Sequence, residues 1–374
     1  MKKKVGFIYL DELQHVPHFL PPAIALAARG VRVDILTYEG GHRYLKTMLN
    51  KLGGEKLNIV QLSTFFYRKI LEKLRDRQQP SAFYIYRKHL HKLLTYDALV
   101  FTDHTAGIIY QARGKAAKPK LVFIDHGAGD GAYGYKESHN LFDLVLVAGM
   151  KKATRLVRDI PDHHFKLKVA GYAKFDLLNN EKEDIRLFEE GNPVVLYCPH
   201  FSRQLSSWYS MGRDILNFFR NHPEYNLIFA PHFNLFNKKG FEKRAAVDRK
   251  YYDAPNIHVD LGSIRSVNMT YARYADIYLG DVSSQVYEFM YLTRPLIFIN
   301  HQNIFWQKDD NYLMWQAGKV VTNVAGLEEA LAGLDVWPID YTARQKELFT
   351  QTFYKPDRPA GPRVAKLIAD EIYG

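Results

Sequence analysis

The segment GDVSSQVYEF, residues 280–289, places two serines and two acids where the chain changes from strand to helix. The apolar run Ile277–Leu279 before it is typical of a strand, and the apolar residues after it follow helical spacing. Ser283 and Ser284 would then lie at a helix N-terminus, where backbone N–H groups and the helix dipole attract an anion. A serine there either caps the helix or binds a phosphate oxygen, and the local pattern leaves both interpretations open.

Two acids extend this candidate anion site. Glu288 comes four residues after Ser284, one turn along the same helix face. Its carboxylate could accept hydrogen bonds from ribose hydroxyls; the alternative is a solvated helix glutamate, which fits its apolar neighbours poorly. We therefore expect a nucleotide to be bound by Asp281, Ser283, Ser284 and Glu288.

Three histidines follow strand-like runs and are candidates for acid–base chemistry. His126 lies in LVFIDHGAGDGAYGYK, beside Asp125 and Asp130 and among four glycines that let backbone approach a ligand closely. His200 and His232 each occur in a Pro-His-Phe sequence in the second half of the chain. A single histidine is more often structural, but three at strand ends favour a site. The expected general base is His126, and Asp130 is the second candidate.

The same residues argue against a metal cofactor. The sequence contains no HExxH pair and no Asp-rich cation loop. Arginines such as Arg203 and Arg265 could share phosphate charge with the helix N-terminus instead. Gly262, in the turn before Arg265, is a further candidate for donor binding.

The elements that must position these residues alternate along the chain. The expected strands are Val5–Leu10, Val31–Thr37, Asn58–Leu62, Ala98–Thr102, Leu121–Ile124 and Leu144–Val147, with helices at Pro21–Arg29 and His42–Leu52. After a Glu-rich stretch at 181–190 the alternation restarts with a strand in NPVVLYCPH, a helix around Gly212–Asn221, and strands at Asn226–Ala230, Ile257–Val259, Ile277–Leu279 and Pro295–Ile299. This alternation predicts parallel sheets with helices on both faces.

The predicted fold class is therefore α/β, with two facing Rossmann-like domains and the ligand cleft between them. In such sheets ligands bind beyond the carboxyl ends of the strands. We expect an N-terminal acceptor domain at 1–180 and a nucleotide-donor-binding domain at 181–355. A C-terminal helix at 356–374 is expected to pack back on the first domain.

Composition limits the partners and the compartment. The 374 residues carry a formal charge of +11, which favours an acidic partner such as a nucleotide, a phosphate polymer, nucleic acid or an anionic membrane. The single cysteine, Cys198, excludes an intramolecular disulfide and fits a reducing compartment. No stretch has the length of a secretory signal or a membrane span. We expect a cytoplasmic protein, either free or attached to the inner face of the cell membrane.

One stretch supports membrane attachment. Residues 65–94, FFYRKILEKLRDRQQPSAFYIYRKHLHKLL, interleave basic side chains with aromatic and aliphatic ones. Such a surface could lie on anionic lipid near a lipid-linked acceptor. The alternative, a core helix with a solvated basic face, has equal support from the pattern.

The motifs in this order resemble the CDP-glycerol glycerophosphotransferase family, which includes the teichoic-acid polymerases and primases. The resemblance is carried by "HG", "VLYCPHFSR", "FAPHF", "YADIYLGDVSSQVYEF" and "RPLIFIN". The most specific piece is the family's Asp-x-Ser-Ser-x-x-x-(Asp/Glu) segment followed by (Lys/Arg)-Pro, which is matched by Asp281, Ser283, Ser284, Glu288, Arg294 and Pro295. The similarity is strongest at 190–300.

The resemblance implies a GT-B fold, a CDP-linked donor in the C-terminal domain and an acceptor bound mainly by the N-terminal domain. By the family's pattern His126 is the catalytic base, His232 binds phosphate or stabilises the leaving group, and Ser283 with Ser284 holds the pyrophosphate. The chain departs from the family in "YCPHFSR", where His200 replaces a threonine and Arg203 is a shifted match to an arginine.

The expected function is therefore a transferase that uses CDP-glycerol or a similar donor to extend or prime an anionic surface polysaccharide. A polysaccharide or a lipid-linked molecule would be the acceptor. An alternative is a nucleotide-sugar glycosyltransferase or UDP-sugar 2-epimerase of the same fold, because "VAGYAKFDLL" and "GDVSSQVYEFMYLTRPLIFI" also resemble that group. A nucleic-acid-binding protein would suit the charge, but no recognition motif supports it.

Overall fold

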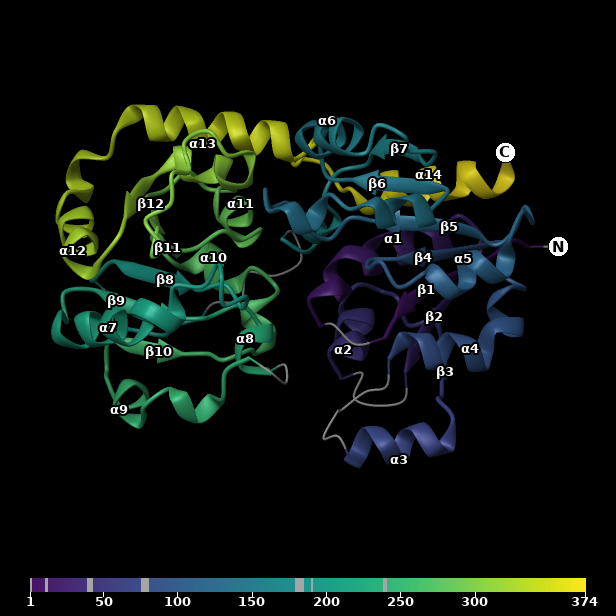
Figure 1. Cartoon of the computed structure of the whole chain (residues 1–374), viewed down its shortest axis with the longest axis horizontal. Helices are drawn as coiled ribbons and strands as arrows, with labels where there is room; N and C mark the ends of the chain where they lie inside the picture. The colour runs from purple at the N-terminus through teal and green to yellow at the C-terminus, as the bar shows by residue number, and fades with distance from the viewer. Residues whose placement is uncertain are drawn as a thin grey trace. The chain divides into compact units, whose positions relative to one another are not determined.

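The computed structural model describes residues 2–10, 13–38, 43–74, 81–178, 185–189, 191–237 and 241–374. The chain divides into two compact units, each built on a parallel sheet (Figure 1). The first unit contains Met1–His126, Tyr135–Glu181 and Gln351–Gly374, and the second contains Gly127–Gly134 and Lys182–Thr350.

The first unit has a seven-stranded sheet in the described part of the chain, with the order β3-β2-β1-β4-β5-β6-β7. Its strands are β1 (Lys4–Tyr9), β2 (Arg32–Tyr38), β3 (Asn58–Leu62), β4 (Ala98–Phe101), β5 (Lys120–Ile124), β6 (Leu144–Val147) and β7 (Lys166–Val169). Its helices are α1 (Val16–Ala28), α2 (Arg43–Lys51), α3 (Phe66–Leu74), α4 (Ala82–Leu93), α5 (Gly107–Arg113), α6 (Met150–Asp159) and α14 (Gly361–Tyr373).

The second unit has a six-stranded sheet in its described residues, with the order β10-β9-β8-β11-β12-β13. Its strands are β8 (Val194–Cys198), β9 (Asn226–Phe229), β10 (Ile257–Val259), β11 (Ile277–Gly280), β12 (Leu296–Ile299) and β13 (Lys319–Val321). Its helices are α7 (Trp208–Asn221), α8 (Asn234–Asn237), α9 (Arg249–Tyr252), α10 (Thr270–Tyr274), α11 (Gln285–Phe289), α12 (Val324–Ala332) and α13 (Ile339–Thr352).

Strand order locates the point in each sheet where ligands usually bind. In the first sheet, β2 and β3 lie on one side of β1, and β4 to β7 follow on its other side, so the strand order reverses between β1 and β4. In the second sheet, the strand order reverses in the same way between β8 and β11. At such a reversal the loops after two neighbouring strands diverge and leave a crevice at their carboxyl ends. In the second unit this crevice lies between the segment after Cys198 and the segment after Gly280.

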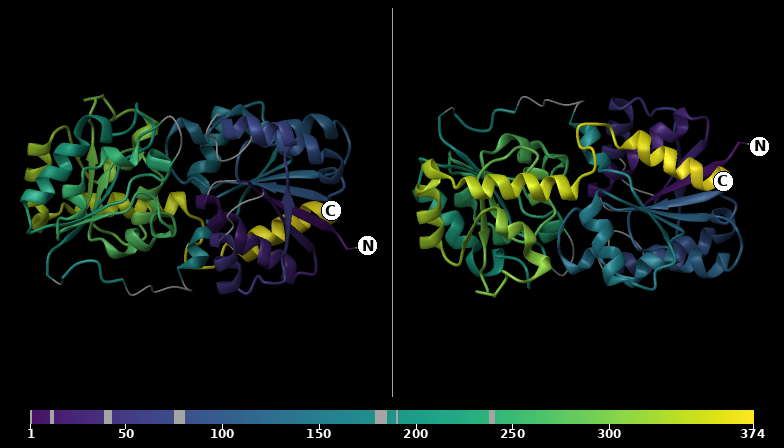
Figure 2. Two further views of the ribbon diagram at one scale, coloured as in Figure 1. Left: turned by 90° about the horizontal axis from the view of Figure 1, so that it is seen from below. Right: turned by 90° about the horizontal axis from the view of Figure 1, so that it is seen from above.

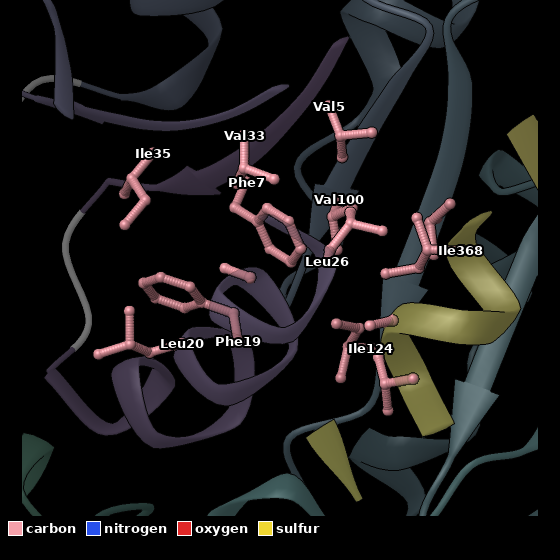
Figure 3. Close-up of a cluster of buried hydrophobic side chains, with 14 of the residues drawn as sticks. Val5, Phe7, Phe19, Leu20, Leu26, Val33, Ile35, Val100, Ile124 and Ile368 are labelled. Carbon is pink, nitrogen blue, oxygen red and sulfur yellow. The ribbon is translucent and has the colours of Figure 1, made fainter. Parts of the chain in front are cut away.

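The core of the first unit joins the two ends of the chain. Phe7 of β1 and Phe19 of α1 pack with their rings 6.3 Å apart, and Ile368 of α14 enters the same buried cluster (Figure 3). Figure 2 shows this C-terminal helix, marked by the letter C, within the first unit. The helix α1 begins at Val16, five residues before the predicted start at Pro21, and continues through Pro21 and Pro22.

The sequence located most strands to within one or two residues, and β3, β6 and β10 match their predicted bounds. It missed β7 and β13, which form sheet edges and begin with lysine. The predicted domain 1–180 differs from the observed unit because Gly127–Gly134 belongs to the second unit. Among the described residues, no helix has the length and apolar character needed to cross a bilayer.

Candidate functional site

Asp281 connects the two sides of the crevice in the second unit. Its Oδ2 accepts hydrogen bonds from the backbone N–H of His200 at 2.8 Å and of Ser207 at 2.9 Å. Ser207 immediately precedes α7, so the carboxylate also lies at a helix N-terminus, where negative charge is favourable. The side chain is fully buried, and this burial raises its pKa to about 7. Asp281 therefore positions the loop after β8 from the interior of the unit.

Two buried serines support the same loop and were not identified from the sequence. Ser206 and Ser207 have no exposed surface. The Ser207 hydroxyl lies 2.8 Å from the hydroxyl of Tyr197 on β8, and the Ser206 hydroxyl accepts a bond from the backbone N–H of Trp208. Buried polar groups that are hydrogen-bonded in this way hold a loop in one conformation.

His200 and His232 lie beyond neighbouring strands, β8 and β9, with ring centroids 5.7 Å apart. Phe201 packs against both rings, with its centroid 4.5 Å from each. The Nδ1 of His200 accepts a bond from the backbone N–H of Ser202 at 3.0 Å, and the Nδ1 of His232 accepts one from Asn234 at 3.2 Å. Because Nδ1 is the acceptor in both rings, the neutral imidazoles carry their hydrogen on Nε2.

The protonation of His200 follows from its surroundings. Burial lowers the pKa of His200 to about 4, so the ring is neutral at physiological pH. A neutral ring with hydrogen on Nε2 donates one hydrogen bond and brings no charge. Two such donors on adjacent strands could bind a phosphate oxygen without a metal.

Ser283 and Ser284 have different environments at the start of α11. The Ser283 side chain is only 7% exposed, and its hydroxyl accepts a bond from the backbone N–H of Gln285 at 3.3 Å. This supports the helix-capping interpretation for Ser283. Ser284 is half-buried and forms no side-chain cap. Its backbone N–H lies 3.3 Å from the position that a Cβ would occupy on Gly129, so glycine at 129 keeps this donor open.

Asp130 has a structural environment rather than that of a base. Its carboxylate accepts bonds from the Tyr287 hydroxyl, at 2.8 and 2.7 Å, and from the backbone N–H of Met314 at 3.0 Å. The side chain is 1% exposed. These bonds anchor the segment Gly127–Gly134 to the second unit. The sequence had made Asp130 the second candidate base, and its burial and hydrogen bonds argue against that role.

Two further residues of the Asp-x-Ser-Ser motif also lie in the interior. Glu288 is 4% exposed and therefore does not present a carboxylate on an open helix face. The Arg294 guanidinium stacks on Phe289 at 3.7 Å and donates to backbone carbonyls, including those of Ala272 at 2.6 Å and Ala275. Burial lowers the pKa of Arg294 to about 10, which leaves it cationic at neutral pH.

The remaining predicted donor-binding residues lie in two loops. Arg203 is exposed and its guanidinium lies 4.8 Å from the Tyr209 ring centroid. Arg265 is exposed in a short 3-10 turn after β10. Gly262 adopts a φ of +124° in the turn before it, and its N–H donates to Asp260 at 2.9 Å. Both arginines are thus accessible, in contrast to Arg294.

In the first unit, His126 belongs to a cluster of three histidines. It follows β5, and its ring centroid lies 4.3 Å from that of His15 and 6.2 Å from that of His18. His15 and His18 precede and begin α1, beyond the carboxyl end of β1. The sequence analysis did not select them, although two histidines three residues apart after the first strand, in QHVPHF, are a readable signal.

Two members of the cluster, His15 and His18, have lowered pKa values. Burial lowers the pKa of His15 to about 4. Burial, together with the charges of Lys174 and the neighbouring histidines, holds the pKa of His18 well below its usual value. The carboxylate of Asp125, the residue before His126, lies 3.3 Å from the Lys152 Nζ.

Comparison with known proteins identifies the family of the chain. The model of the family described as CDP-Glycerol:Poly(glycerophosphate) glycerophosphotransferase matches residues 133–370, which is more than half of the sequence. The chain belongs to this family. It is accordingly a transferase, as the motifs had predicted, and the match includes the crevice of the second unit.

Similar solved structures show the fold. The wall teichoic acid polymerase TagF matches with a TM-score of 0.65 and 16% identity, over 100% of this chain and 89% of that one. The UDP-GlcNAc 2-epimerase from Neisseria meningitidis, bound to UDP-GlcNAc, has a TM-score of 0.62 at 14% identity and 99% coverage of both chains. The glycotransferase of kitacinnamycin has a TM-score of 0.60 at 12% identity and 99% coverage of both chains. These similarities confirm the predicted GT-B type of α/β fold. The search of curated proteins found no match.

The described residues also bear on metal binding. Within the ranges that the structure describes, no group of three or more His, Cys, Asp or Glu side chains has an arrangement that could hold a metal ion.

Proposed function

We propose that this enzyme transfers an alditol phosphate from a CDP-linked donor, CDP-glycerol or a close analogue, to a hydroxyl of an anionic surface polymer. Family membership supports the reaction class. The observation that carries the proposal is the pair His200 and His232, which lie beyond adjacent strands of the second unit with Nδ1 of each ring accepting a backbone hydrogen bond. The structures of TagF include one soaked with CDPG, which supports the same class of donor.

The proposed reaction is a displacement at phosphorus. A general base removes the proton of the acceptor hydroxyl while its oxygen attacks the donor phosphorus that carries the alditol. The bond from that phosphorus to the bridging oxygen breaks, and CMP leaves with the electron pair. We assign His126 as the base, as the sequence predicted. The Nε2–H groups of His200 and His232 and the backbone N–H of Ser284 would stabilise the negative charge on the phosphates.

The exposed arginines complete the proposed donor site. Arg203 and Arg265 are accessible and permanently cationic, so they suit an anionic diphosphate. The buried residues Asp281, Ser283 and Glu288 would act by fixing the backbone around this donor. We propose that no metal cofactor is required.

The epimerase and glycosyltransferase alternatives require a different nucleotide. The fold alone does not discriminate, because the epimerase and TagF have similar TM-scores, 0.62 and 0.65. Calorimetric titration with CDP, UDP and GDP separates them. The proposal predicts that CDP binds at least about tenfold more tightly than UDP. Tighter binding of UDP would favour the alternatives and contradict a CDP-linked donor.

We further propose that α3 attaches the enzyme to an anionic membrane surface. The helix exposes apolar side chains from one face, with Phe66 and Leu74 each 78% exposed and Ile70 47% exposed. This exposure contradicts the alternative of a core helix. Large exposed apolar patches mark interaction surfaces, and the exposed Lys69 on α3 with Arg87 and Lys88 on α4 complements anionic lipid. Part of the predicted stretch, residues 75–80, lies outside the described residues.

Vesicle sedimentation tests this attachment. The enzyme should pellet with vesicles that contain phosphatidylglycerol, and much less with phosphatidylcholine alone. Phe66→Glu combined with Leu74→Glu should abolish pelleting, because both changes place charge on the apolar face. Tyr252→Glu, at an aromatic position on α9 with 48% exposure, is the control. Equal pelleting of the double variant would show that α3 does not contact the lipid.

A further inference from the structure

The second unit contains a cavity that none of the proposed donor residues line. It has a volume of about 690 Å³ and lies beyond β12 and beside β13. Trp306, Trp315 and Tyr341 contribute aromatic surface, and Gln307, Gln316 and Thr322 contribute polar groups. The loop after β12 that lines this cavity also contacts the loop after β8, because the Gln302 side-chain nitrogen donates to the Gln204 carbonyl at 2.9 Å.

The lining of this cavity is uncharged. Its residues include asparagine, glutamine, threonine, tryptophan and tyrosine but no Lys, Arg, Asp or Glu, although the chain as a whole carries a charge of +11. A phosphate-rich ligand would gain nothing from such a lining. A sugar ring suits it, because the C–H face of a pyranose packs on an aromatic ring and its hydroxyls pair with side-chain amides.

Trp315 forms the buried wall behind this lining. Its side chain is 3% exposed, so it supports the cavity rather than contacting a ligand directly. The ring packs on Trp306, with centroids 5.8 Å apart, and on Tyr312 at 4.7 Å. Trp306, which is only half-buried, therefore presents its aromatic surface from a fixed position.

Other polar side chains shape the cavity and hold it in one form. The side-chain nitrogen of Asn300 donates to the Ile304 carbonyl at 3.0 Å, and the Asn300 Oδ1 accepts a bond from the Ile304 N–H at 2.9 Å. These two bonds fix the turn after β12. The Gln316 Oε1 accepts a bond from Arg344 at 2.6 Å, which leaves the Gln316 amide nitrogen to face a ligand. A largely pre-formed cavity of this kind is typical of a small-molecule site.

A second hollow continues the first. It has a volume of about 640 Å³ and shares Val320, Thr322 and Tyr341 with the cavity. The two together form an elongated surface along β13. An elongated surface fits several linked units better than a single sugar.

We propose that this cavity binds an uncharged pyranose unit of an oligosaccharide, with Trp306 and Tyr341 as its aromatic surface. The inference deepens the proposed function, because a polysaccharide acceptor would supply such a unit, and a second contact would keep the acceptor on the enzyme between transfers. The site itself is defined by its neutral aromatic lining and does not depend on which nucleotide is bound.

Saturation-transfer NMR on the full-length enzyme tests the site with cellobiose and N,N′-diacetylchitobiose as probes. At least one disaccharide should bind with a dissociation constant on the order of 1 mM, and the corresponding tetrasaccharide should bind more tightly. Trp306→Ala should weaken binding about tenfold or more, because it removes a stacking surface. Gln307→Ala should weaken it less. Tyr252→Ala, an exposed aromatic outside the cavity, is the matched control.

Several outcomes would overturn the proposal. These are no saturable binding of either disaccharide, equal binding by Trp306→Ala, or binding of glycerol or ribitol in preference to the disaccharides. CDP affinity and circular dichroism are measured on the same variants. Unchanged CDP affinity in Trp306→Ala shows that the donor site and the fold are intact, so loss of sugar binding is then specific. If neither disaccharide binds while CDP binds normally, only the proposed sugar site is refuted. If the parent enzyme does not bind CDP, only the proposed donor is refuted.

Discussion

The two units both place histidines beyond the carboxyl ends of strands, but they control those rings in different ways. In the second unit, His200 and His232 each accept a hydrogen bond from a backbone N–H two residues later, so a local turn fixes each ring nitrogen. In the first unit, His15 and His18 pack against His126 and are controlled by burial and by one another's rings. A local bond specifies which nitrogen carries hydrogen, whereas burial specifies whether the ring is charged.

This difference matches the two tasks that a transferase needs. Fixed Nε2–H donors suit binding of a phosphate, which requires direction and no change of protonation. A cluster of rings held uncharged suits a base, which must take up a proton during the reaction. That these two groups act on one reaction across a cleft between the units remains a prediction from the sequence.

The largest expected effect is on acid stability. Burial lowers the pKa of His200 in the second unit to about 4 and lowers those of His258 and His301 as well, so the expected difference between the units rests on the larger number of such histidines in the described part of the first unit. Burial lowers the pKa of His15 to about 4 from its usual 6.5, so the unfolded chain binds this proton more readily than the folded one. The contribution of neutral His15 to the free energy of unfolding is therefore fully present above pH 6.5 and is lost as the pH falls toward 4. The change for His15 alone corresponds to on the order of 3 kcal/mol. His18, His104 and His139 of the first unit are lowered in the same direction, chiefly by burial.

The chain offers a direct way to separate the units in this experiment. Its four tryptophans, Trp208, Trp306, Trp315 and Trp337, all lie in the second unit. Tryptophan fluorescence therefore reports on that unit alone, while circular dichroism reports on both. On acidification between pH 6.5 and 4, the loss of dichroism should begin before the change in fluorescence. His15→Gln should shift the first transition to lower pH. Coincident transitions in all variants would contradict the difference between the units.

The next effect concerns turnover. His126→Ala should lower turnover by roughly 100-fold or more, because a general base acts on a proton that moves only as the new bond forms. CDP affinity should change little. His232→Ala should weaken both turnover and CDP affinity, since its ring belongs to the second unit's donor pair. His91→Ala, an exposed histidine on α4, is the control. Near-normal turnover in His126→Ala would make this histidine a structural member of its cluster.

The sequence predicted the described strands except β7 and β13, and even the edge strands β3 and β10 match their predicted bounds. Strands such as Leu144–Val147 are buried runs of apolar residues, and their pattern is unambiguous. The edge strands β7 and β13 carry lysines and few apolar residues, as edge strands often do, so their pattern resembles that of a loop. The Gly127–Gly134 segment was assigned to the wrong unit because sequence order does not reveal which unit a loop packs against.

The sequence predicted which residue types form the candidate site but not which of those residues are buried. The segment after β11 was selected correctly as a strand-to-helix turn, yet the sequence does not show that Asp281 and Glu288 are buried. The hydrogen bonds of Asp130 to Tyr287 and Met314 join residues far apart in the chain, so no local pattern indicates them. His15 and His18 were missed because their proximity to His126 arises only when β1 and β5 lie in one sheet.

A smaller effect is expected at the start of α11. Ser284→Val combined with Ser283→Val should weaken CDP binding by about tenfold, because bulky apolar groups would obstruct the backbone N–H of Ser284 and remove a cap. Gly129→Val should have a similar effect, since a Cβ there would lie 3.3 Å from that nitrogen. Ser210→Val, on an exposed position of α7, is the control. Unchanged CDP affinity in both variants would remove this turn from the donor site.

The finest test distinguishes the ring nitrogens of the second unit. The glutamine side-chain nitrogen occupies approximately the place of a histidine Nε2, and the asparagine nitrogen that of Nδ1. If His200 and His232 act as neutral Nε2–H donors, His232→Gln should keep CDP affinity within about threefold of the parent, whereas His232→Asn should lose about tenfold, which corresponds to one neutral hydrogen bond. The same order should hold at His200, whose pKa of about 4 leaves the ring neutral from pH 6 to 8. In the first unit the corresponding pair, His126→Gln and His126→Asn, should both lose turnover, because neither amide accepts a proton. Retained affinity in His232→Asn with loss in His232→Gln would reverse the assigned tautomer and remove the contrast between the units.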